Sequence, residues 1–170
     1  MRKIIFLYFL LLTMFAACSG VSDKELYDTA KEKYYSGNYE ETLYNYEKLI
    51  QEFPKSKYRA EVLFELGKLY HGQVVKSLTK DQNYTKAIDN YRKVFSEFPN
   101  YKDAPNSMFM TGFVYANELS VLDSAEYYYN LFIKKYPDNE MVISAKAELE
   151  NLGVPAEEIL RRKVTKGEGE

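Results

Sequence analysis

One nine-residue pattern occurs three times in this chain and constrains its fold more than any other feature. Each copy has an aromatic residue, an apolar pair three and four positions later, a second aromatic residue at the eighth position, and then Pro. The copies occupy residues 46–54, 91–99 and 129–137. Apolar residues at this spacing lie on one face of an α-helix, and the Pro cannot continue the helix. The pattern therefore predicts three amphipathic helices that end in the same way.

A second amphipathic segment precedes each copy and carries a small residue in its middle. These residues are Ala30, Gly67 and Gly112, and each is followed by a tyrosine three or four positions later. A small side chain allows two helices to approach closely. Gly37 and Asn38 suit the turn between the two helices of the first unit. We therefore expect an all-α chain of three antiparallel helix pairs.

Two motifs, Leu66-Gly67-x-x-Tyr70 and Gly37-x-Tyr39-x-x-Thr42, resemble the tetratricopeptide repeat (TPR), and the resemblance extends over residues from about 23 to 137. It implies a TPR-type superhelix with repeats at 23–55, 56–100 and 101–138. Large apolar residues precede each aromatic–Pro pair, where the general family has Ala. They are Leu49, Val94 and Phe132. This variation is typical of periplasmic lipoproteins of the BamD and YbgF/CpoB type, which the chain resembles most.

The second and third repeats are longer than the first. The second contains about eight additional residues near 72–82, and the third contains one additional residue between Gly112 and Ala125. The longer insertion either extends the first helix of its repeat, with a polar turn at 79–83, or forms a protruding loop. The helical extension is the favoured interpretation. Asn83-Tyr84-Thr85 has the form of a glycosylation sequon, which we interpret as accidental.

The segment after the last repeat is predicted to cap the stack. Apolar and charged residues alternate over 139–152, and Gly153 and Pro155 end this helix. A stack of repeats exposes an apolar face at its end, which such a helix covers. A second short helix is expected from Pro155, so that 139–162 form the cap. Residues 163–170 have little to bury and are expected to be disordered.

The N-terminus has the features of a bacterial export signal. Arg2 and Lys3 precede an apolar run at 4–17, which as a helix would reach only about 21 Å and is too short to span a membrane. Residues 1–17 therefore read as a signal peptide. Residues 15–20 resemble a lipobox, which implies a lipid on Cys18, a tether at 18–22 and, with Ser19 next to it, a location at the periplasmic face of the outer membrane. The alternative is an ordinary secretion signal followed by an inert cysteine.

The composition excludes several classes of function. With 23 Lys and Arg against 25 Asp and Glu, the chain lacks the positive charge that nucleic-acid binding requires. A single Cys and a single His exclude an internal disulfide and any site that needs two imidazoles. No Gly-rich phosphate loop is present, so no cofactor and no small-molecule substrate are expected. A cell-wall hydrolase using Glu61 and Glu65 is a weak alternative, because charges belong on an exposed helix face anyway.

Protein binding therefore remains as the expected function. The TPR resemblance implies a concave groove lined by the first helix of each pair, and the same rings could equally pack between helices. The positions carried over are Tyr27, Lys31, Tyr34, Tyr35, Phe64, Lys68, His71, Phe109, Phe113 and Asn117. The expected partners are envelope proteins or peptide segments, with the membrane reached through acylated Cys18. The candidate pathways are outer-membrane protein assembly and the coordination of cell division or cell-wall synthesis.

Overall fold

The computed structural model describes residues 20–167, and the predicted signal peptide and Cys18 lie outside that range. The described part of the chain is helical and contains no strand, which confirms the all-α prediction. Its elements are α2 (Asp23–Tyr35), α3 (Tyr39–Glu52), α4 (Arg59–His71), α5 (Lys80–Glu97), α6 (Ala104–Phe113), the π-helix η2 (Val114–Glu118), α7 (Leu122–Lys135), α8 (Val142–Glu150) and α9 (Ala156–Gly167). No helix within residues 20–167 is long and apolar enough to cross a membrane.

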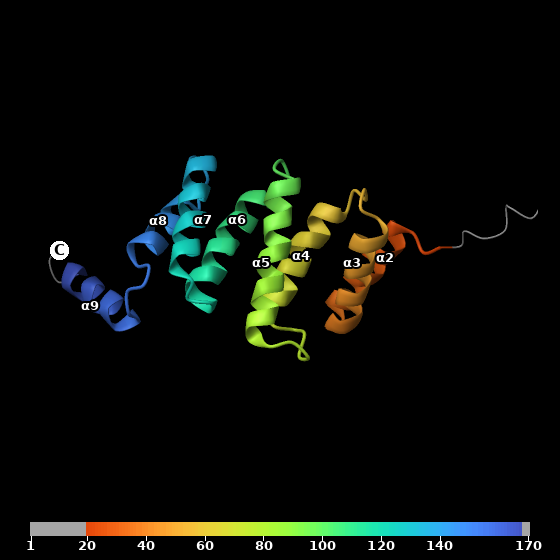
Figure 1. Ribbon diagram of the computed structural model, residues 1–170, viewed down its shortest axis with the longest axis horizontal. Helices are drawn as coiled ribbons and strands as arrows, with labels where there is room; N and C mark the ends of the chain where they lie inside the picture. Colours follow the sequence, from red (N-terminus) through yellow and green to blue (C-terminus); the bar gives the residue numbers. More distant parts are fainter. Residues whose placement is uncertain (1–19, 168–170) are drawn as a thin grey trace, which may run out of the picture.

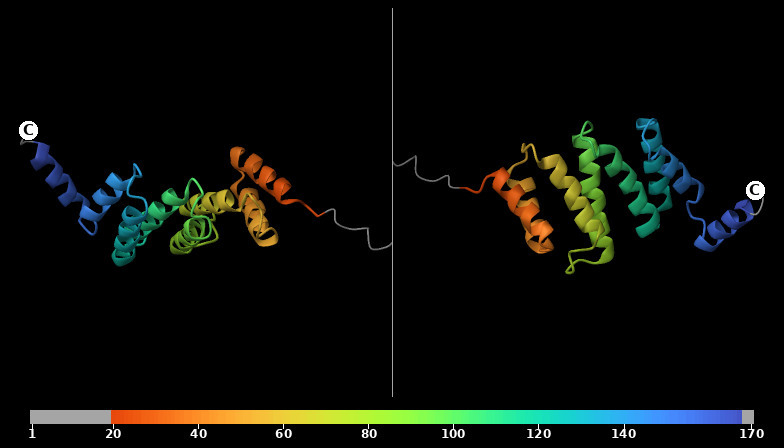
Figure 2. Two further views of the ribbon diagram at one scale, coloured as in Figure 1. Left: turned by 90° about the horizontal axis from the view of Figure 1, so that it is seen from above. Right: turned by 180° about the vertical axis from the view of Figure 1, so that it is seen from behind.

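The helices form an elongated row, with α2 at one end and α9 at the other (Figure 1). Helices α2 and α3, α4 and α5, and α6 and α7 contact one another as pairs. Seen from above, α2, α4 and α6 lie in one layer and α3, α5 and α7 in the other (Figure 2, left). The chain therefore has two broad faces, one built by each layer.

The repeated pattern supplies the core between these layers. The first tyrosines of the three copies, Tyr46, Tyr91 and Tyr129, are 2%, 1% and 0% exposed. Gly67 and Gly112 let two of these rings approach, since a Cβ on Gly67 would lie 2.5 Å from the Tyr91 ring. Each second helix ends at the aromatic residue that precedes Pro, as the pattern predicts.

The insertion in the second repeat differs from the favoured interpretation. Helix α4 ends at His71, residues 72–79 form a loop, and α5 is 18 residues long where α3 and α7 are 14. The prediction of an extended first helix with a polar turn at 79–83 is therefore wrong. Thr79 and Gln82 form a capping box, which starts α5 one turn early.

Asn83 fixes the path of this loop. Its side chain is 1% exposed, and Nδ2 donates to the carbonyl oxygens of Val75 and Thr79 at 3.1 Å. Because the amide is enclosed, the sequon at Asn83 is closed to modification in the folded chain. Burial of a side-chain amide requires such hydrogen bonds, so the loop and Asn83 hold each other in place.

Two features appear further along the chain. The additional residue of the third repeat falls in a region where α6 continues as η2, with the Leu119 N–H bonded to the Val114 carbonyl at 3.1 Å. A π-helical turn absorbs one extra residue in a helix.

The predicted disorder from residue 163 is wrong for 163–167, because α9 continues to Gly167. Glu158 supports α9 through Arg161 and Arg162, one turn further on.

Candidate protein-binding groove

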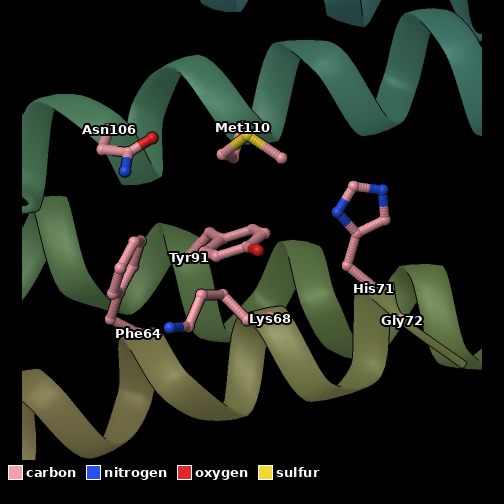
Figure 3. Close-up of a pocket in the computed structure, with 7 residues that line it drawn as sticks. All are labelled: Phe64, Lys68, His71, Gly72, Tyr91, Asn106 and Met110. Carbon is pink, nitrogen blue, oxygen red and sulfur yellow. The ribbon is translucent and has the colours of Figure 1, made fainter. Parts of the chain in front are cut away.

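A hollow of about 380 Å³ lies between α4 and α6, with Tyr91 of α5 beneath it. Phe64, Lys68 and His71 enter it from α4, and Asn106 and Met110 point toward them from α6 (Figure 3). The lining is mostly carbon, and its polar groups stand at the margin. A hollow of this kind can accept an apolar side chain of a ligand, and its few polar groups can orient that ligand through hydrogen bonds.

The floor of the hollow is rigid because its aromatic rings pack on one another. The Phe64 ring is 8% exposed and lies 5.9 Å from the Tyr91 ring, centroid to centroid. Burial raises the pKa of Tyr91 well above that of a free tyrosine, so its hydroxyl stays neutral. Lys68 Nζ lies 2.8 Å from Glu65 Oε1 and 5.4 Å from the Phe64 ring centroid. The ammonium therefore stands at the rim with its charge compensated.

His71 closes the far end of the hollow and links three elements. Its Nε2 lies 3.4 Å from Glu118 Oε1 of η2. Its ring lies 6.1 Å from those of Tyr84 and Phe113, in edge-on contacts. A hydrogen bond with Glu118 raises the pKa of Tyr84. The π-helical turn therefore brings Glu118 to the corner where α4, α5 and the third repeat meet.

The neighbouring junction, between α2 and α4, is filled. Tyr27 donates its hydroxyl hydrogen to Glu61 Oε1 at 2.6 Å, and Lys31 Nζ lies 3.3 Å from the same oxygen. The Tyr27 ring also stacks on Tyr58 with centroids 4.2 Å apart. The hydrogen bond from Lys31 to Tyr27 raises the pKa of Lys31, and burial raises that of Tyr27. This network occupies the space that is open one repeat later.

The remaining predicted positions lie in different surroundings. Tyr34 contacts Tyr35 edge-on, and Tyr35 is 77% exposed at the end of α2. Phe109 packs against Tyr129 and Phe132 and does not line the hollow between α4 and α6. Phe113 contacts His71. Asn117 lines a separate hollow near α8.

Sequence reasoning missed Asn106 and Met110 as lining residues. The first helix of a repeat faces the first helix of the preceding repeat with one side and that of the following repeat with another side. When Gly67 is aligned with Gly112, Asn106 and Met110 fall at the positions of Glu61 and Glu65. The positions that the TPR resemblance supplied on α6 all lie on its other side, so the side of α6 that faces α4 was not predicted.

The two glutamates of the hydrolase alternative are both paired. Glu61 accepts from Tyr27 and Lys31, and Glu65 pairs with Lys68. Within residues 20–167, no group of three or more His, Cys, Asp or Glu could hold a metal ion.

Stacked helix pairs define a helical-repeat protein, and the apolar hollow on one of its layers is a candidate binding groove. The family model described as YfiO, outer membrane lipoprotein, matches residues 20–153, and the chain belongs to this family. The match confirms the predicted resemblance to BamD-like TPR lipoproteins and the predicted outer-membrane location. No curated protein matches the chain.

Proposed function

We propose that this lipoprotein is a non-enzymatic adaptor for outer-membrane protein assembly that binds an extended segment of another envelope protein across α4 and α6. The observation that carries the proposal is the hollow between Phe64, Tyr91 and Met110, which is open where the preceding junction is filled. Membership in the YfiO family of outer membrane lipoproteins supports the pathway.

The binding mechanism rests on a surface formed before the partner arrives. The Phe64 and Tyr91 rings are held by packing, so little side-chain freedom is lost when an apolar group enters. Aromatic rings with few rotatable bonds concentrate in the energetic centre of interfaces. Lys68 and Asn106 at the rim donate hydrogen bonds to backbone carbonyls of the bound segment, which fixes its direction.

The attachment to the membrane is assigned to Cys18. An acyl chain contributes about 0.8 kcal/mol per buried CH₂, so two or three chains hold a protein firmly. The tether at 18–22, at about 3.5 Å per residue, keeps α2 close to the membrane surface. Labelling cells with a palmitate analogue tests the assignment. The native chain incorporates label and Cys18→Ser does not, whereas equal labelling of both would contradict it.

Photocrosslinking in the native envelope tests the groove. A photoreactive residue at Met110 is expected to form an adduct with a partner protein, because that side chain points into the hollow. The matched control is Tyr44, which is 63% exposed on α3 in the other layer. Adducts of equal yield from both positions, or none from Met110 in a folded chain, would exclude this groove.

A further inference from the structure

The layer opposite the proposed groove carries a second recess, between α5 and α7. These two helices run in the same direction (Figure 1). One hollow of about 400 Å³ lies between them, and another of about 470 Å³ lies along α7. Tyr127 and Leu131 line both hollows and form the ridge between them. We call the two hollows and this ridge the outer groove.

The middle of the outer groove is apolar and well supported. Tyr127 is 60% exposed. Its ring lies edge-on to Tyr128 at 5.1 Å, and Tyr128 stacks on Tyr115 at 5.7 Å. A large exposed ring fixed by its neighbours is typical of an interface centre.

Charge is distributed unevenly along the outer groove. When Tyr91 is aligned with Tyr129, the carboxylates all precede the cations along the direction in which the two helices run. The carboxylates are Asp89, Asp123 and Glu126, and the cations are Arg92, Lys93 and Lys134. None of these six side chains has an ion-pair partner within the described residues 20–167.

Single helices commonly carry acids at the start and bases at the end, because these charges complement the helix dipole. Here α7 has this polarity, and on the parallel helix α5 the carboxylate of Asp89 likewise precedes the cations of Arg92 and Lys93, so the charge order is the same along both sides of the groove. The surface that complements this groove has the opposite charge order, with an apolar group at its centre. The outer groove turned end for end is such a surface.

We propose that the outer groove is the interface of a homodimer, in which a second copy of the chain docks with α5 and α7 antiparallel to those of the first. Arg92, Lys93 and Lys134 then face Asp89, Asp123 and Glu126 of the partner copy at both ends. Tyr127 and Leu131 of the two copies pack near the two-fold axis. Such a contact uses one self-complementary patch twice, as two-fold interfaces do.

The geometry agrees with attachment to one membrane. The helices stand across the long axis of the row (Figure 1). A two-fold axis along that row makes the helices of the second copy run in the opposite direction. It keeps the N-terminal end of both copies at the same end of the row. Both N-termini of the dimer therefore lie at the same end, as two lipid-anchored chains on one membrane surface require.

Charge swapping in the full-length chain tests the dimer. The full-length protein in detergent is expected to sediment as a dimer. In one double variant, Asp123→Lys with Glu126→Lys, the two hollows keep only the carboxylate of Asp89 and become mainly basic. In the other, Arg92→Glu with Lys93→Glu, they keep only the cation of Lys134 and become mainly acidic. Each variant alone places like charges at both ends of the interface, so association is expected to weaken by at least about tenfold.

An equal mixture of the two variants is the decisive measurement. Each basic groove then meets an acidic one, and the mixture is expected to regain the dimer. Lys55→Glu, an exposed charge change outside the groove, serves as the control and leaves the dimer intact. Circular dichroism and thermal unfolding verify that all variants fold. A monomeric native chain, with the groove then free for a different protein, would overturn the proposal, as would variants that dimerise normally or a mixture that does not.

Discussion

The α2–α4 and α4–α6 junctions are built from equivalent positions of the repeat, yet the first is filled and the second is open. Tyr27 and Lys31 of the first junction correspond to Phe64 and Lys68 of the second. In the first, Glu61 accepts from both side chains. In the second, its counterpart Asn106 stands over a hollow. The side chain on the facing helix is therefore one difference between the closed and the open junction.

The floors of the two junctions differ in the same sense. Ala30 stands where the second junction has Gly67, and Tyr46 stands where it has Tyr91. Without a Cβ on Gly67, the Tyr91 ring sinks toward α4 and leaves room above it. The open groove thus results from two differences between the repeats. Gly67 replaces Ala beneath the groove, and Asn106 replaces Glu on the facing helix.

The largest effect is expected from Gly67→Ala, which raises the floor. The new Cβ would lie 2.5 Å from Tyr91 Cε1, so the ring must move into the hollow. Overpacking costs about 1–3 kcal/mol and Ala returns about 1 kcal/mol of helix propensity, which gives a net loss of stability of up to about 2 kcal/mol. Urea unfolding measures it. Gly112→Ala is the control, because its Cβ would lie 3.0 Å from Tyr129 and should cost less. Equal losses would refute the packing argument.

Glu61→Asn is expected to open the first junction. The shorter, neutral side chain loses the ion pair with Lys31 and the hydrogen bond from Tyr27. The side chains of Lys31 and Glu61 are each 36% exposed, so solvent screens their attraction and the loss should be about 1 kcal/mol. Thermal unfolding provides the measurement. Glu25→Asn, an exposed change on α2, is the control and should shift the transition less.

Asn106→Glu is expected to close the second junction. The longer carboxylate can reach Lys68 as Glu61 reaches Lys31, and it should stabilise the chain by up to about 0.5 kcal/mol. The photocrosslink from Met110 should fall, because the hollow is occupied. Asn106→Gln adds the same length without charge. Retention of the full adduct with Asn106→Glu would show that the partner does not use the hollow.

The smallest effect is expected from alkaline pH. Both Lys31 and Tyr27 have raised pKa values, so below about pH 10 each has the same protonation state in the folded and unfolded chain. As the pH rises further, the unfolded chain loses these protons first and the junction loses stability. The stability difference between the native chain and Glu61→Asn should therefore narrow above about pH 10. A constant difference up to the pH at which the chain unfolds would contradict the assigned network.

The helices could be predicted from sequence because their signals are local. The spacing of Tyr46, Leu49 and Phe53, closed by Pro54, defines a helix and its end without reference to distant residues. The path of residues 72–79 could not be predicted from sequence, because it depends on the burial of Asn83 and on a positive φ of 54° at Gln73. The spacing of Thr79 and Gln82 was the one local sign that α5 begins early.

The candidate site shows the same division. Phe64, Lys68 and His71 were predicted because the repeat carries their positions from one unit to the next. Asn106 and Met110 were missed because a hollow needs two facing surfaces, and the relation between neighbouring helices is a property of their packing. The homology of positions therefore predicts one wall of the groove, and the other wall requires the structure.

The amide of Asn83 also determines where the folded chain resists cleavage. Exposed loop tips are preferred sites for proteases, and Lys76 is exposed within the loop that this amide holds. While the amide keeps its hydrogen bonds, trypsin meets a constrained backbone at Lys76. Without them, the same lysine becomes the place at which the protein is cut in two, between α4 and α5. Resistance to digestion in the envelope thus depends on a single side chain that makes no contact with any partner proposed for this protein.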